Sequence, residues 1–158
     1  LSLDQDAILR ANISDSLLLK CGEPNDLKTV IDYQPTEPDA DVKTWMQFAI
    51  DEFIPPKPAT LNWNGLTTRL IDYTGEMYGY GWIADTETRD YYRSRLNSLK
   101  MEIQAGDMGQ ACSSVNTLLA KMEQDLEESA ITIEGYKFLH YYTIYIKEEM
   151  EQMFGACL

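Results

Sequence analysis

The chain has 158 residues, of which 44% are apolar or aromatic, and its 26 acidic against 13 basic side chains give a formal charge of −13. A chain of this length can bury a hydrophobic core without stabilising disulfides or metals. It fits one domain, or one domain with a short accessory segment. A surface that binds nucleic acid needs clustered Lys and Arg to neutralise the phosphates. The net negative charge therefore argues against binding to nucleic acid and to anionic membrane surfaces. No run of 18 apolar residues occurs, and we therefore expect no membrane insertion.

The first residues, from Leu1 to Asp6, contain neither an initiator Met nor the basic and apolar regions of a signal peptide. We therefore expect the chain to be a processed product or a piece of a longer protein.

Residues 1–54 form an N-terminal segment that we expect to be mostly helical. A helix is predicted over residues 4–21, ended by Gly22 and Pro24. Residues 27–33 fit a strand or a helix, and residues 34–40 a loop. Asp41 is then the expected N-cap of a further helix. The apolar residues of that helix are Val42, Trp45, Met46, Ala49, Phe53 and Ile54.

Three prolines, Pro55, Pro56 and Pro58, separate this segment from the rest of the chain. Proline blocks a helix and restricts the residue before it, so residues 55–61 are predicted to be a linker. No proline follows Pro58, which favours long uninterrupted helices over residues 62–158.

Four capped amphipathic helices are predicted in residues 62–158. Asn64, Asp85, Asp107 and Thr132 are the expected N-caps. Glycines are the expected stops of three of these helices, namely Gly79 and Gly81, Gly106, and Gly155. Apolar residues recur every three or four positions, which gives each helix one buried face. The expected inward residues are Leu66, Leu70, Tyr73, Met77, Tyr92, Leu96, Leu99, Ile103, Met108, Ala111, Val115, Leu118, Met122, Leu126, Leu139, Tyr142, Ile146, Met150 and Met153. The fold class is therefore all-α, an antiparallel helical bundle.

Residues suited to catalysis or metal binding are sparse. His140 is the single histidine, and Cys21, Cys112 and Cys157 lack metal-ligand spacing. Whether any two cysteines form a bridge stays open. Paired carboxylates on a small bundle would need a deep cleft to hydrolyse glycosides. We therefore expect no enzyme, no metal and no cofactor.

The aromatic residues between Tyr73 and Trp82 are the candidate binding site. Tyr78, Tyr80 and Trp82 lie in a glycine-containing stretch where two predicted helices meet. On an exposed loop these rings could stack on a sugar or anchor a protein partner. The other interpretation is that Trp82 and one tyrosine close the end of the bundle.

The second half of the chain resembles the FIVAR and FIMAH helical modules of bacterial extracellular proteins, over about residues 66–150. The matching features include Gly81-Trp82-Ile83 before a helix, the turn from Gln104 to Asp107, and the Ile131-Thr132 start of the last helix. The resemblance implies an accessory module on a secreted or cell-surface protein, and it carries no catalytic residues.

Two functions follow as hypotheses. The first is a non-catalytic, acidic extracellular module that binds a protein or glycan partner. The alternative is a cytoplasmic inhibitor or immunity-type protein whose acidic surface occludes a basic partner. Strong salt dependence of binding and acids clustered on one face would favour the alternative.

Overall fold

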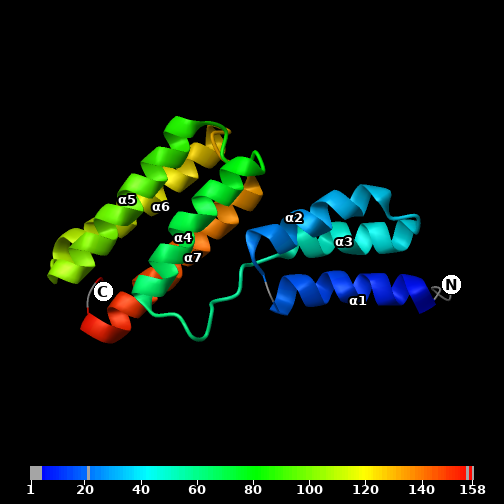
Figure 1. Ribbon diagram of the computed structural model, residues 1–158, viewed down its shortest axis with the longest axis horizontal. Coiled ribbons are helices and arrows are strands. Elements are labelled where there is room, and N and C mark those ends of the chain that lie inside the picture. The colour runs from blue at the N-terminus through cyan, green and yellow to red at the C-terminus, as the bar shows by residue number, and fades with distance from the viewer. Residues whose placement is uncertain (1–4, 21, 156, 158) are drawn as a thin grey trace. The chain divides into compact units, whose positions relative to one another are not determined.

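The computed structural model describes residues 5–20, 22–155 and 157, and in them the protein is all-α (Figure 1). No β-strand occurs within this part of the chain, and only an isolated antiparallel bridge joins Ile83 to Ile131. The chain divides into two compact units, residues 1–56 and residues 57–158. The boundary falls within the proline-rich stretch.

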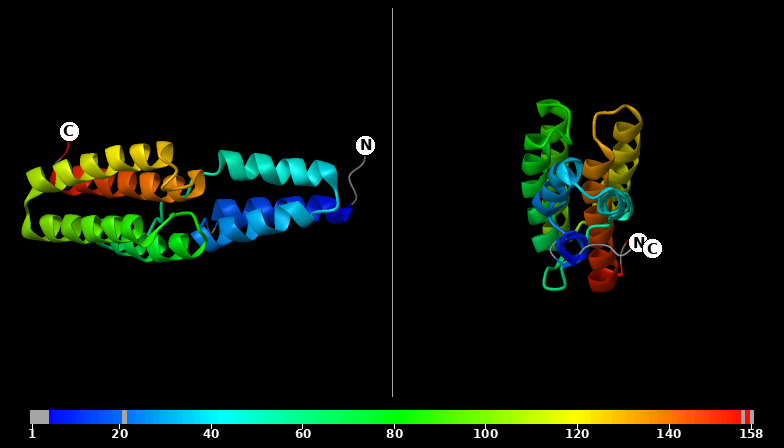
Figure 2. Two further views of the ribbon diagram at one scale, coloured as in Figure 1. Left: turned by 90° about the horizontal axis from the view of Figure 1, so that it is seen from above. Right: turned by 90° about the vertical axis from the view of Figure 1, so that its right-hand side faces the viewer.

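Unit 1 consists of three helices, α1 (Gln5–Lys20), α2 (Pro24–Tyr33) and α3 (Ala40–Glu52), with a 3₁₀ turn η1 (Gln34–Thr36) before α3. Seen end-on, the three helices lie at the corners of a triangle (Figure 2). Helices α1 and α3 run in the same direction and α2 runs against both (Figure 1). Residues 27–33, which fitted a strand or a helix, are helical.

The N-cap of α3 differs from the prediction. Asp39, not Asp41, caps the helix, because its Oδ1 accepts the backbone N–H groups of Asp41 and Val42. Arg10 on α1 forms an ion pair of 2.9 Å with Glu37, which is buried in the loop before this cap. The hydrogen bond from Arg10 keeps the pKa of the Glu37 carboxyl below its usual value.

Unit 2 is a four-helix antiparallel bundle of α4 (Trp63–Gly79), α5 (Thr86–Ala105), α6 (Met108–Glu127) and α7 (Ile133–Phe154). Each helix packs against two others, in the cyclic order α4, α5, α6, α7. The predicted inward residues form its core with three exceptions. Met108 and Leu126 on α6 are only half-buried. Met153 is 55% exposed, because it follows Met150, the last fully buried side chain of α7.

Three of the four predicted N-caps in unit 2 are confirmed, namely Asp85, Asp107 and Thr132. The prediction for α4 is wrong by two residues. Asn62 caps that helix, since its Oδ1 accepts the N–H of Gly65, and Asn64 lies inside the first turn. The α5 helix ends at Gly106, whose φ of 75° is a left-handed conformation that glycine adopts without a Cβ clash.

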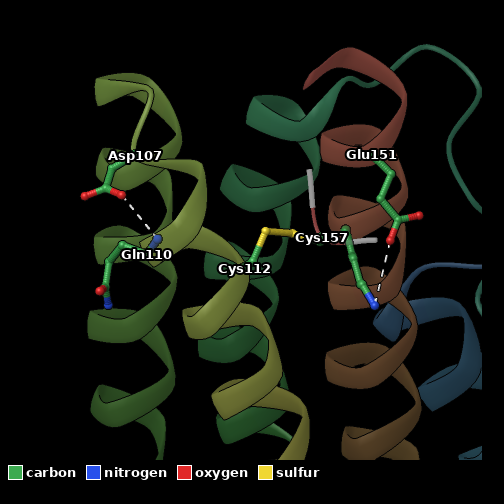
Figure 3. Close-up of a disulfide and its surroundings, with 6 residues drawn as sticks. Asp107, Gln110, Cys112, Glu151 and Cys157 are labelled. Atoms are coloured by element: carbon green, nitrogen blue, oxygen red, sulfur yellow. Dashed lines mark hydrogen bonds and ion pairs between the residues drawn. A yellow bond between two sulfur atoms is a disulfide. The ribbon is translucent and has the colours of Figure 1, made fainter. Parts of the chain in front are cut away.

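A disulfide joins Cys112, in the second turn of α6, to Cys157, just after α7 (Figure 3). The two Cα atoms are 5.3 Å apart, and 45 positions separate the two cysteines in the sequence. Figure 3 also shows the Asp107 cap beside it, whose carboxylate accepts the Gln110 N–H at 3.2 Å. The bridge therefore fastens the end of the chain to the start of α6. Cys21 lies outside the described residues.

Candidate functional site

The predicted aromatic site lies at the end of α4, and its three rings have different environments. Trp82 is only 6% exposed and stacks on Phe138 of α7, with the ring centroids 6.2 Å apart. Tyr80 is half-buried and meets Trp82 edge-on at 5.3 Å. Tyr78 is also half-buried, and the Arg89 guanidinium lies 4.8 Å from its ring centroid.

The backbone around Trp82 explains its burial. The Trp82 N–H donates to the Met77 carbonyl, and the Trp82 carbonyl accepts the N–H of Thr132, the cap of α7. A Cβ on Gly135 would lie 2.7 Å from that carbonyl oxygen, so glycine permits the close approach. Trp82 is buried, as the plug interpretation expects. A binding role for Tyr78, Tyr80 and Trp82 stays a prediction.

His140 and two glutamates of α7 contact neighbouring side chains. His140 is half-buried on α7, its Nδ1 lies 3.1 Å from the Tyr136 hydroxyl, and burial lowers its pKa. Lys57 forms ion pairs with Glu148 and Glu149. Within the described parts of the chain, no three His, Cys, Asp or Glu side chains gather as metal ligands.

A buried cluster of hydrogen-bonded polar side chains has a structural role in unit 2. The Tyr92 hydroxyl donates to Asp125 Oδ2 at 2.6 Å, and Lys121 also bonds to this carboxylate. Burial and the Asp125 carboxylate raise the pKa of Tyr92, so the hydroxyl stays protonated and keeps donating. The Asp125 carbonyl accepts the N–H groups of Ala130 and Ile131. This cluster joins α5 to α6 and ends α6.

A site that the sequence reasoning did not identify lies in unit 1. Large apolar side chains on α1 and on or just after α3 are solvent-exposed: Ile8 by 45%, Trp45 by 55%, Phe48 by 61% and Ile54 by 53%. Single exposed apolar residues are common on protein surfaces, whereas a group that includes a tryptophan and a phenylalanine is a candidate interaction site.

These side chains border two adjoining hollows between α1 and α3, which we call the α1–α3 groove. Asp15 and Trp45 line both hollows. The first hollow, of about 190 Å³, is also lined by Ile8, Ala11, Asn12 and Val42. The second, of about 280 Å³, is also lined by Leu18, Phe48, Ala49, Glu52, Phe53 and Ile54.

Side-chain size explains why the groove is hollow. Ala7 and Ala11 on α1 pack against Val42 and Met46 on α3. The short alanine side chains let the two helices approach closely. Trp45 and Phe48 stand beside this contact, with ring centroids 6.5 Å apart in an edge-to-face arrangement. The groove thus has a floor of small or buried residues and walls of large exposed ones. Such a surface suits an apolar ligand side chain better than bond chemistry.

The sequence did contain a signal for this groove. At 100° per residue, the apolar positions of α3 from Phe48 and Trp45 through Val42 to Ile50 cover an arc of about 200°. A helix with two neighbours in a small unit buries a narrower arc. Only Val42, Met46 and Ile50 within α3 are buried, and the rest of the arc forms one wall of the groove.

Comparisons with protein-family models, with curated proteins and with solved structures find no match to this chain. The identification of the α1–α3 groove as a candidate site therefore depends on its geometry alone. None of the described helices is both long and apolar enough to cross a membrane.

Proposed function

We propose that this chain is a non-catalytic interaction module that binds a protein partner through the α1–α3 groove. The single observation that carries the proposal is the exposure of Trp45 and Phe48 beside two apolar hollows. Tryptophan and other large aromatic side chains supply much of the binding energy at protein interfaces, because each loses a large apolar area to the partner.

Location on a secreted or cell-surface protein is part of this proposal. The Cys112–Cys157 bridge supports it, because such bonds persist in oxidising compartments and are rare in the cytosol. The resemblance to extracellular accessory modules points the same way. The cytoplasmic inhibitor is the weaker alternative, since it would have to keep this bridge in a reducing environment. A protein partner is favoured over a glycan, because most groove-lining residues are apolar.

Selection of peptides from a random display library on the full chain tests the proposal. The enriched peptides should bind the unaltered protein, and Phe48→Ser and Trp45→Ser should each weaken binding by about tenfold or more, because the apolar contact area is lost. Met101→Ser is the matched control, since Met101 is 68% exposed on α5, outside the groove.

The proposal fails if the selected peptides bind both groove variants as well as the unaltered chain. It also fails if Tyr80→Ala abolishes binding of the selected peptides while Phe48→Ser leaves that binding unchanged. That result would move the contact to the aromatic residues at the end of α4.

A further inference from the structure

The two hollows of the α1–α3 groove lie one after the other along α3. The lining residues advance along α3 from Val42 through Trp45 to Ala49, and Phe53 follows just after the helix. Val42 and Ala49, which line different hollows, are seven residues apart, or about 10 Å along the helix axis at 1.5 Å per residue. A ligand helix lying along the groove would therefore present large apolar side chains to the two hollows at positions i and i+7.

The described charged residues that line the groove are acidic. Asp15 lines both hollows and Glu52 lines the second, and no basic residue lines either one in the described part of unit 1. The described basic side chains of the unit bond elsewhere: Arg10 to Glu37, Lys28 to Asp32, and Lys43 to the Pro35 carbonyl. Residues 1–56 carry 11 acidic against 4 basic side chains.

This charge selects among the possible occupants. A second copy of the chain would bring another acidic rim against Asp15 and Glu52, and each copy carries a formal charge of −13. A partner helix with Lys and Arg beside its apolar stripe would instead meet complementary charge, which speeds association and selects the partner.

We propose that the occupant of the α1–α3 groove is a basic amphipathic helix with two large apolar anchors at positions i and i+7. This inference rests on the proposed function, because it names the partner class of the same groove. The apolar anchors fill the two hollows, and the basic side chains lie over the acidic rim.

Three synthetic 16-residue helical peptides without tryptophan test this inference on the full chain. The first carries Phe at positions i and i+7 and Lys or Arg on its polar face. In the second, Glu replaces every basic residue. The third has the composition of the first, with the second Phe moved to i+9, which turns that side chain to the opposite face. Fluorescence anisotropy of labelled peptides gives each dissociation constant at low and high salt.

The first peptide should bind at least about tenfold more tightly than the second or third, and salt should weaken its binding. Phe48→Ser should weaken it by about tenfold or more. The control Leu9→Ser, at a residue 57% exposed on α1 that does not line the groove, should change it by less than about twofold. The double variant Asp15→Asn/Glu52→Gln should weaken binding severalfold and reduce its salt dependence.

The possible failures are distinguishable. If the basic and acidic peptides bind equally and both lose affinity on Phe48→Ser, the basic partner is wrong and the groove remains a binding site. If the i+9 peptide binds as tightly as the first, the two-anchor geometry is wrong. If the basic peptide binds Phe48→Ser as tightly as the unaltered chain, it binds through surface charge, and this inference and the proposed function both fail. Binding of no peptide to the unaltered chain overturns the inference.

Discussion

At the residue scale, exposure separates the three tryptophans of this chain. Trp82 is buried in unit 2, Trp63 is half-buried at the start of α4, and Trp45 is 55% exposed in unit 1. The sequence indicated an aromatic site at Trp82 because tyrosines and glycines surround it. Its contact with Phe138 could not be predicted from that pattern, since 56 positions separate the two residues.

Replacement of Trp82 tests its role in the bundle. Trp82→Ala should destabilise unit 2 by about 3–5 kcal/mol, because it removes a buried ring and leaves a cavity beside Phe138. Trp82→Phe, which keeps an aromatic ring, should cost less. Urea unfolding followed by the backbone amide signals of α7 measures both. Unchanged stability of Trp82→Ala together with lost peptide binding would instead make this ring a contact surface.

At the element scale, apolar spacing predicted the helices except α2, whose residues fitted a strand or a helix, and the N-caps of α5, α6 and α7 were also predicted correctly. The starts of α3 and α4 were not. The sequence offers Asp39 and Asp41 before α3, and Asn62 and Asn64 before α4, and in each case the earlier residue caps. Both residues of each pair are good N-caps by type. The direction in which the chain enters the helix decides between them, and this direction depends on tertiary packing.

Two helical glycines give a matched test of how α7 docks. Gly135→Ala should destabilise unit 2 by about 1–3 kcal/mol, because the new Cβ would lie 2.7 Å from the Trp82 carbonyl oxygen. Gly75→Ala, inside α4, should stabilise it by about 0.5–1 kcal/mol, since its Cβ meets only Arg93 Nη1 at 3.9 Å. Equal effects of the two substitutions in urea unfolding would contradict the close approach of α7 to Trp82.

At the scale of the whole molecule, the all-α class followed from the sequence, but the disulfide did not. Three cysteines allow three different single bridges, and neither spacing nor composition distinguishes them. The apolar groove was also missed. Helical spacing shows which side chains share a face, but the size of unit 1 decides how much of that face is covered.

Reduction of the disulfide should affect the two units differently. In the chain-entropy view, opening a bridge between cysteines 45 positions apart should cost unit 2 about 2–4 kcal/mol. Amide signals of α2 and α7 during thermal unfolding report the two units separately. Reductant should lower the melting temperature seen at α7 and leave that at α2 unchanged, with Cys21→Ser as the control. An equal fall at both helices would contradict this assignment of the bridge.

The indole N–H signals of the full chain give the most direct test of the α1–α3 groove as the binding surface. Trp45, Trp63 and Trp82 contribute one signal each to an ¹H–¹⁵N spectrum. Titration with the basic two-anchor peptide should move the Trp45 signal and leave those of Trp63 and Trp82 in place. A shift of the Trp82 signal with Trp45 unmoved, or saturated binding without any change at Trp45, would contradict the account.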